Sequence, residues 1–320
     1  MSAGQFLVTG GFFDGGCDGY IGELELRQRD GVTTMSFEPR LTHEPADSAL
    51  RVPNKGFTGA SIVDHRLWVC GANQVLAFEI GRWLLVERLD DPAFNDLHHV
   101  LAEEQGLTVV NTGLESVDVF DRRGVFQERI LLTSDARTRQ RLERVAEFRT
   151  CDSNPHFMHA SHCARTTDGG LLVTLVRQRR VIDCRDWSWA SPEYPAPPHD
   201  GFLAEHAPSG RRLLWATTVS GGIFASDPVT HEIIECWSLP DRGGPVGWTR
   251  GLCVLEDGML VGTTRIRSNN AEYFERWTSR SHARSRTAIA FLPFDERIPV
   301  VSIDVFPQRP AKVFSILRAP

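Results

Sequence analysis

The sequence lacks the short motifs that are typical of several common enzyme classes. No glycine-rich dinucleotide fingerprint follows a strand-like run, and no Walker-type phosphate loop, no Gly-x-Ser-x-Gly nucleophile elbow and no His-Glu-x-x-His helix occurs. The seven cysteines are odd in number and form no Cys-x-x-Cys pair. We therefore expect no nucleotide cofactor, no disulfide framework and no cysteine-rich zinc site.

An excess of positive charge and long apolar runs are also missing. The chain has 35 Lys and Arg residues against 41 Asp and Glu residues, a formal net charge of -6. Proteins that bind nucleic acid or anionic membranes need a basic excess, so neither partner is expected. The N-terminus shows no basic and then apolar leader, and no segment reaches the roughly 18 apolar residues that span a bilayer. These patterns predict a cytoplasmic protein.

A repeat runs through most of the chain. Five similar segments have second apolar runs that begin at Leu67, Leu107, Leu171, Leu213 and Met259. Each segment joins β-rich runs through Gly or polar turn residues, as in "LTVVNTGLESVDVFD". The intervals are 107−67 = 40, 171−107 = 64, 213−171 = 42 and 259−213 = 46 residues. All but one match a four-stranded propeller blade of roughly 40–50 residues.

The long interval and the two ends of the chain complete this prediction. Leu142, Val145 and Phe148 recur at helical spacing, which predicts one short inserted helix near 134–150. The segment "QFLVTGG" begins a blade that has no first strand, and "KVFSILRAP" near the other end is a lone strand. Pairing the two gives an all-β, six-bladed β-propeller without exposed sheet edges, in which residues 1–320 form a single domain.

This strand pattern, with "NTGLESVDVFD" as its clearest copy, resembles the broad class of six-bladed propellers that includes gluconolactonase-like lactonases, strictosidine-synthase-like proteins and the streptogramin lyases. The resemblance covers the architecture of nearly the whole chain and includes no catalytic motif. It implies a propeller that is either a hydrolase, lyase or cyclase, with or without a metal, or a binding protein.

Polar residues recur where the first strands of the blades are expected to begin. Counting back nine residues from the starts of four apolar runs, at Leu67, Leu107, Leu171 and Met259, gives one column: Thr58, His98, His162 and Arg250. The fifth copy has a longer turn, and its matching position is His199 or Asp200. A second column, three residues earlier, pairs Asn95 with His159. First strands line the central channel of a propeller, so we expect these side chains to meet at one mouth of the channel.

Two kinds of chemistry remain open for this ring. His98, His162 and His199 form a set of three imidazoles that suits one divalent ion, Zn, Fe, Mn or Ni, with an open position. Without a metal, one neutral histidine is an acid or base, Asp200 or Asn95 orients it, and Arg250 holds a carboxylate or phosphate. The residues predicted to contact the substrate are Asn95, His159, Thr58 and Trp248.

The leading hypothesis is an enzyme with non-redox lyase, isomerase or hydrolase chemistry on a small, polar, anionic molecule at the channel mouth. The segment 265–286 has six Arg against two Glu, which favours steering of an anionic substrate or a contact in a homo-oligomer. The alternative is a non-catalytic propeller that binds a protein or ligand through 134–150 and 265–286. That alternative predicts a channel filled with apolar side chains.

Overall fold

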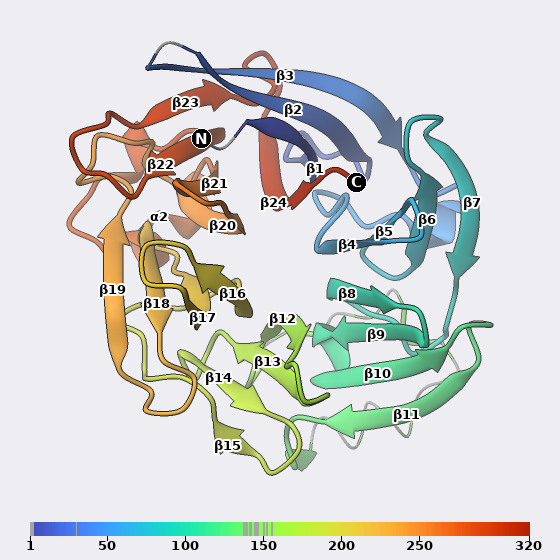
Figure 1. Cartoon of the computed structure of the whole chain (residues 1–320). Coiled ribbons are helices and arrows are strands. Elements are labelled where there is room, and N and C mark those ends of the chain that lie inside the picture. The colour runs from blue at the N-terminus through green and yellow to red at the C-terminus, as the bar shows by residue number, and fades with distance from the viewer. Residues whose placement is uncertain are drawn as a thin grey trace.

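A ring of β-sheets surrounds a central channel in the computed structural model (Figure 1). The structure describes residues 3–29, 31–136, 140, 143, 147–149, 151, 153–154 and 156–320. Within these residues there are six sheets, each with four hydrogen-bonded strands. The predicted six-bladed β-propeller is therefore confirmed.

Each blade contributes one strand to the wall of the channel. These innermost strands are β4 (Ala60–Val63), β8 (Leu97–Glu103), β12 (Ala160–Arg165), β16 (Phe202–His206), β20 (Trp248–Val254) and β24 (Ala311–Arg318). The second strands are β1 (Gly4–Phe12), β5 (Arg66–Cys70), β9 (Gly106–Asn111), β13 (Leu171–Leu175), β17 (Arg211–Thr217) and β21 (Gly258–Thr264).

The third and fourth strands complete the blades toward the outside of the ring. The third strands are β2 (Gly19–Arg29), β6 (Val75–Glu79), β10 (Ser116–Asp121), β14 (Arg180–Asp183), β18 (Gly222–Ser226) and β22 (Ala288–Pro293). The fourth strands are β3 (Val32–His43), β7 (Leu84–Leu89), β11 (Phe126–Leu131), β15 (Ser188–Trp189), β19 (Ile233–Ser238) and β23 (Val301–Asp304).

The hydrophobic core lies between neighbouring blades. The middle strands are covered on both faces, so β13 and β21 read as short apolar or small-residue runs that are buried along their whole length. The outermost strands keep exposed positions, and β3 contains no fully buried residue. Burial therefore follows the position of a strand in its blade, as close packing around a ring requires.

The two ends of the chain close the ring, as the sequence predicts. Strand β24 pairs antiparallel with β1, with Phe6 opposite Arg318 and Phe12 opposite Ala311. This pairing gives the first blade its inner strand and leaves no open edge between the first and last parts of the chain.

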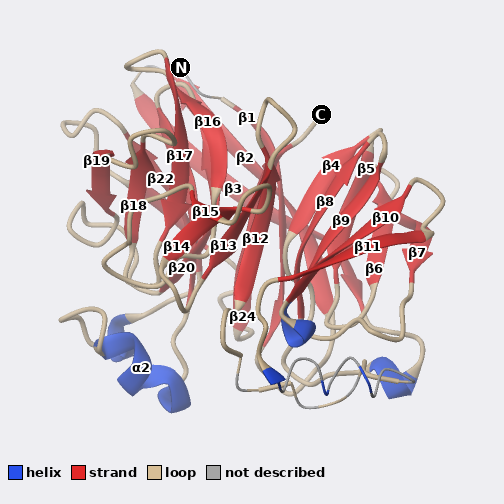
Figure 2. Cartoon of the chain, turned by 90° about the horizontal axis from the view of Figure 1, so that it is seen from below, coloured by secondary structure: helices blue, strands red, loops and turns tan. Residues whose placement is uncertain are grey.

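Few residues are helical. The structure describes one short α-helix, α2 (Ala271–Glu275), and the 3₁₀ turns η1 (Ser48–Leu50), η2 (Thr112–Leu114), η3 (Ser268–Asn270) and η4 (His282–Arg284). Helix α2 lies on the face of the ring opposite the chain ends (Figure 2). The helix predicted near 134–150 falls largely outside the described residues. None of the described helices has the length and apolar character needed to cross a membrane.

Candidate functional site

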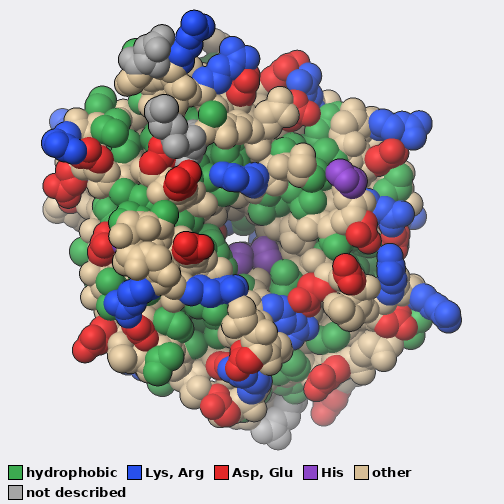
Figure 3. Space-filling model, viewed as in Figure 1, with side chains coloured by type: hydrophobic (Ala, Val, Ile, Leu, Met, Phe, Trp, Pro, Cys, Tyr) green, Lys and Arg blue, Asp and Glu red, His purple; other side chains and the backbone are tan. Residues whose placement is uncertain are grey.

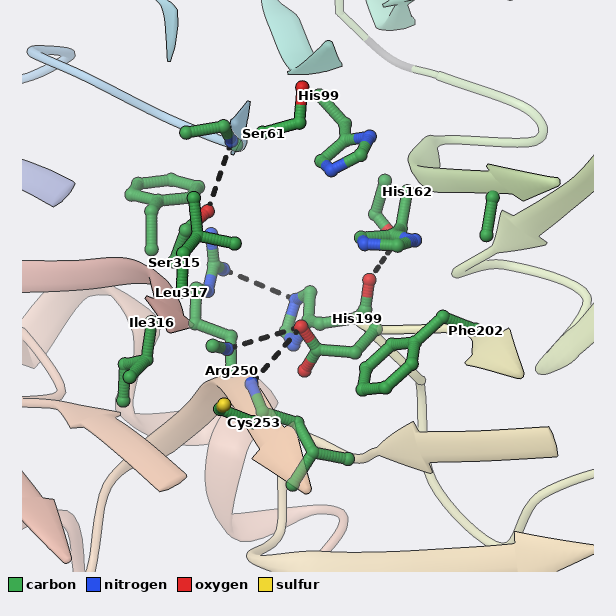
Figure 4. Close-up of a pocket in the computed structure, with 18 of the residues that line it drawn as sticks. Ser61, His99, His162, His199, Phe202, Arg250, Cys253, Ser315, Ile316 and Leu317 are labelled. Atoms are coloured by element: carbon green, nitrogen blue, oxygen red, sulfur yellow. Dashed lines mark hydrogen bonds between the residues drawn. The ribbon is translucent and has the colours of Figure 1, made fainter. Parts of the chain in front are cut away.

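Two cavities follow the channel, and histidine side chains are visible at the bottom of the central hollow (Figure 3). One cavity, of about 550 Å³, is lined by residues that precede or begin the inner strands, and by part of the 265–286 segment. We call it the basic chamber. The other, of about 320 Å³, runs along the inner strands, and we call it the inner chamber (Figure 4). Four residues line both cavities: His98, His199, Arg250 and Phe314.

Backbone bulges place two of these four side chains. The strand register shifts between Leu97 and His99 in β8, so His98 is the extra residue of that strand. A similar shift in the pairing of β24 with β1 leaves Phe314 without a partner. A bulge bends its strand and changes the direction of a side chain, and such bulges are common next to functional sites.

The predicted alignment of His98 with His162 is wrong by one residue. Ala102 of β8 pairs with Leu107, five residues later, whereas Arg165 of β12 pairs with Leu171, six residues later. The turn "TTDGG" is therefore one residue longer than its counterpart "EEQG", and counting back nine residues from Leu171 stops one residue short of the equivalent position, Ser161. A shift of one residue on a strand moves a side chain to the opposite face.

His99, not His98, is consequently the neighbour of His162. The rings of His99 and His162 lie 3.9 Å apart in the inner chamber, where Figure 4 shows them next to each other. His98 instead faces His159, with ring centroids 4.9 Å apart, and both line the basic chamber. Burial lowers the pKa of His162, and burial together with the nearby His162 lowers the pKa of His99 well below its usual value.

His199 is held at both ring nitrogens. Its Nδ1 lies 3.0 Å from the carbonyl oxygen of Thr249, which fixes that nitrogen as the donor. Its Nε2 then accepts a hydrogen bond from Trp248 Nε1 at 2.8 Å. It also accepts one from Arg250 Nη2 at 3.2 Å (Figure 4). Burial, with the charge of Arg250, holds the pKa of His199 well below its usual value. The neutral ring therefore orients Trp248 and Arg250.

The predicted metal centre is not assembled by the described residues. The lone pair of His199 Nε2 is already used by two donors, and the Nδ1 of the same ring donates to the backbone. Across the described parts of the chain, no three His, Cys, Asp or Glu side chains form a group that could hold a metal ion. His98, His162 and His199 are thus not a three-ligand set.

The basic chamber has a strongly cationic lining in a protein whose net charge is negative. Its described cationic residues are Lys55, Arg177, Arg250, Arg265, Arg267 and Lys312. Asp96 is the one carboxylate among its described lining residues, and it forms an ion pair with Lys55. None of the other five cations pairs with a carboxylate of the described residues. Cationic side chains therefore outnumber carboxylates among the described lining residues of the chamber.

Aromatic rings support several of these cations in place of carboxylates. The Arg250 guanidinium lies 4.2 Å from the centroid of Phe314, and the Arg267 guanidinium lies 4.6 Å from that of Phe13. Lys312 Nζ lies 5.1 Å from the centroid of Phe13. Burial lowers the pKa of Arg250 to about 10, which means that its charge is poorly solvated.

His98 is the acid or base candidate of the basic chamber. Its Nδ1 lies 2.8 Å from the carbonyl oxygen of Asp96, so Nδ1 carries the proton and Nε2 has a free lone pair. No described residue donates to that Nε2. Burial lowers the pKa of His98 to about 4, against the opposing effect of the Asp96 carboxylate. His98 is accordingly a neutral imidazole near neutral pH, which is the form that accepts a proton.

Glu115 positions His159 and was not predicted. Its buried carboxylate accepts hydrogen bonds from the backbone N–H groups of Phe157 at 2.8 Å, Met158 at 2.6 Å and His159 at 3.4 Å. His159 has a left-handed backbone, with φ of 52°. The carboxylate thus holds the tight turn that brings His159 to the chamber.

Replacing Glu115 with Gln is expected to lower the free energy of unfolding by about 1–3 kcal/mol, because the amide has a single acceptor oxygen for these N–H groups. Urea denaturation of the variant measures the change. Glu104→Gln, in an exposed turn, is the matched control. Equal unfolding free energies for the two variants would contradict the positioning role of Glu115.

Two residues predicted to contact substrate have structural roles instead. Asn95 is buried, and its side-chain amide donates to the carbonyl oxygens of Phe148 at 2.6 Å and Cys151 at 2.9 Å. The Thr58 hydroxyl donates to the carbonyl oxygen of Leu97 at 2.8 Å, which ties the start of β4 to β8. Thr58 lines the basic chamber, but its hydroxyl hydrogen is already donated to the backbone.

Asp200 also stabilises the backbone. One carboxylate oxygen accepts from the Thr217 hydroxyl, and the other accepts from the N–H groups of Gly251 at 3.2 Å and Leu252 at 3.4 Å. Its carboxylate therefore holds the bulge that follows Arg250, and its charge also opposes the lowering of the pKa of His162 by burial. Trp248, by contrast, lines the basic chamber and stacks on Tyr273, with ring centroids 5.6 Å apart.

The prediction from sequence missed several residues of the basic chamber: Lys55, Asp96, Lys312 and Phe314. Asp96 was visible in "FNDLHHV" two residues before His98. A stronger signal was the rarity of lysine, because the chain contains only two lysines and both line this chamber.

Comparison with known proteins identifies no family. No family model matches the sequence, and no curated protein matches it. A protein of unknown function from Bacteroides caccae superposes with a TM-score of 0.61 at 9% identity, over 98% of each chain. A chain of a nidogen/laminin complex gives a TM-score of 0.61 at 9% identity, over 99% of each chain.

Propeller lyases are also among the similar structures. A catalytically inactive variant of virginiamycin B lyase from Staphylococcus aureus, solved with quinupristin, gives a TM-score of 0.46 at 12% identity, over 79% of this chain and 71% of the lyase. At these identities a structural likeness shows the fold alone. The chain is a six-bladed β-propeller of the broad architectural class that the sequence pattern resembles.

Proposed function

We propose that the chain is an enzyme that binds a small anionic molecule in the basic chamber and carries out non-redox lyase, isomerase or hydrolase chemistry on it. The observation that carries the proposal is the set of four arginines in this chamber, Arg177, Arg250, Arg265 and Arg267, without an ion-pair partner among the described residues. Arg177 and Arg265 are exposed, but the Arg250 guanidinium lies deep in the channel, where burial lowers its pKa. A buried charge without an ion-pair partner is costly, so an anion that binds from solution explains this arrangement best.

The residues that line the basic chamber have distinct proposed roles. Arg250 holds a phosphate or carboxylate of the substrate, since His199 and Phe314 fix the plane of its guanidinium. His98 accepts a proton through its free Nε2. Trp248 and Tyr273, which are stacked with an interplanar angle of 17°, provide a flat wall for the substrate.

The alternative of a non-catalytic binding propeller is less well supported. It predicts a channel filled by apolar side chains, whereas the basic chamber has a volume of about 550 Å³ and a cationic lining. Pockets of this size usually accommodate small molecules.

Loss of anion binding tests the proposed function. Inorganic phosphate is titrated by calorimetry into the wild type and into Arg265→Gln/Arg267→Gln, which removes two charges from the chamber. We expect phosphate to bind the wild type and to bind this variant on the order of tenfold more weakly, because charge-assisted contacts are lost. Phosphorylated and carboxylated compounds that bind are then followed by NMR for turnover.

A matched control separates the chamber from its surroundings. Arg276→Gln/Arg284→Gln makes the same change of charge in the same segment, but neither residue lines the chamber. It is expected to keep the wild-type affinity. Equal weakening in both double variants, or no phosphate binding by the wild type, would overturn the proposal.

A further inference from the structure

The two lysines of the chain stand apart from its other cations. Of 35 Lys and Arg residues, two are lysines, Lys55 and Lys312, and the remaining 35−2 = 33 are arginines. Both lysines line the basic chamber. A guanidinium keeps its proton near neutral pH, whereas an amine can lose its proton and act as a nucleophile. The chain therefore has amine side chains only where a small molecule could reach them.

The surroundings of the two lysines differ. Lys55 forms an ion pair with Asp96, so its ammonium group already has a partner. Lys312 is 6% exposed and donates to the carbonyl oxygen of Asn54, with Nζ 2.6 Å from that oxygen. No carboxylate of the described residues pairs with it. Burial, with the charges of Lys55 and Arg250, holds the pKa of Lys312 well below its usual value.

The fold leaves room for this side chain and holds its backbone. Gly11 lies opposite Lys312 in the pairing of β1 with β24. A Cβ at Gly11 would lie 3.2 Å from Lys312 Cε, and a Cβ at Gly10 would lie 1.9 Å from the Lys312 carbonyl oxygen. The Tyr20 hydroxyl donates to that oxygen at 2.9 Å. The "GG" of "VTGGFF" is therefore required by the close approach of Lys312.

We propose that Lys312 is an amine nucleophile that forms an imine with a small aldehyde or ketone bearing a phosphate or carboxylate group. This inference rests on the proposed function, because the same cations that hold the anionic group bring the carbonyl carbon to the amine. A desolvated lysine beside other cationic groups is the environment in which protein amines act as nucleophiles.

The step is balanced without any other reactant. The neutral Nζ of Lys312 adds to the carbonyl carbon, and the π electrons of the C=O bond move to oxygen, which takes up a proton that nitrogen releases. The carbinolamine then loses its oxygen as water, together with the second N–H hydrogen, and a C=N bond forms. Protonation of this imine withdraws electrons from the neighbouring carbon, which is the requirement for lyase or isomerase chemistry at that carbon.

Reductive trapping tests the inference. The wild type is incubated with pyridoxal 5′-phosphate, reduced with borohydride, digested and mapped by mass spectrometry. Labelling of Lys312 is expected, on the order of tenfold faster than with pyridoxal, because the cationic lining concentrates the phosphate compound. Pyruvate with borohydride replaces the phosphate by a carboxylate and shows which anionic group the chamber prefers.

Two lysine variants show which residue carries the label. Lys312→Arg keeps a cation but has no nucleophilic amine, and its label at position 312 is expected to be lost while phosphate still binds. Lys55→Arg leaves Lys312 as the single lysine, so any lysine label must lie there. If Lys312→Arg does not fold, the peptide map of the labelled wild type still shows whether Lys312 forms the imine.

The outcomes separate this inference from the proposed function. Label confined to Lys55 or to the α-amine, or no label although phosphate binds, would overturn the role of Lys312 and leave anion binding intact. Absence of phosphate binding, with Lys312 labelled equally by pyridoxal and its phosphate, would support the reactive amine and overturn the anionic substrate.

Discussion

Lowering the pH from 7 to 5 is expected to reduce the free energy of unfolding by about 2–5 kcal/mol, because buried neutral histidines must take up protons when the chain unfolds. Five histidines along the channel have lowered pKa values, with burial as the largest cause: His98, His99, His159, His162 and His199. Each is neutral in the folded protein and has an ordinary pKa near 6.5 in the unfolded chain.

The sign and the pH window follow from these shifts. Below about pH 6.5 the unfolded state binds more protons than the folded state, so stability that is fully present above this pH is lost as the pH falls. For His98 the loss continues to about pH 4, where its folded form also becomes protonated. Carboxylates with ordinary pKa values near 4 contribute little between pH 7 and 5. The histidines therefore dominate in this range.

Urea denaturation at pH 7, 6 and 5 measures the effect. His162→Gln is expected to lower the dependence on pH by up to about 1.4 kcal/mol per pH unit, the value for one proton. His65→Gln removes an imidazole from an exposed turn away from the channel and serves as the control. A free energy of unfolding that is the same at pH 7 and pH 5 would contradict the burial of neutral histidines.

Replacing Arg250 with Met is expected to weaken phosphate binding about 100-fold while raising the free energy of unfolding by about 1–2 kcal/mol. Arg250 has no carboxylate partner among the described residues, and its buried Nε has no hydrogen-bond partner. A methionine of similar length can pack against Phe314 without the cost of burying a charge. Arg250 would thus be retained for binding at the expense of stability.

Calorimetry with phosphate and urea denaturation measure the two quantities on the same protein. Arg276→Met is the control, since that side chain is 64% exposed and lies outside the basic chamber. It is expected to change neither quantity by much. An Arg250→Met protein that binds phosphate normally, or that is strongly destabilised, would show that the guanidinium has a structural role.

Sequence periodicity predicted the fold better than the site because the two depend on different spacings. The blade count and the pairing of "QFLVTGG" with "KVFSILRAP" follow from alternating runs about 40 residues apart, and one extra turn residue leaves them unchanged. Along a strand, by contrast, successive side chains point to opposite faces, so the direction of a side chain depends on an alignment that is correct to one residue. The single extra residue in "TTDGG" was enough to misplace His162.

Other parts of the site have no internal copy from which to predict them. Arg265, Arg267 and Tyr273 come from a segment that no other blade has, so no alignment of repeats places them over the channel. Lys312 lies on the lone C-terminal strand, which the repeat anchors did not include. His98 and Arg250 follow regular spacing from Leu107 and Met259, and both line the chamber together with Trp248.

Closure of the ring has a consequence for the order of events during synthesis. Among the strands of the ring, β1 is made before the others and its partner β24 after them, so the first blade stays incomplete until β24 has left the ribosome. Lys312 and Phe314 both belong to this final strand. A nascent chain therefore has five blades and the histidines of the channel, but no buried amine. The reactive group enters its pocket in the same event that completes the fold.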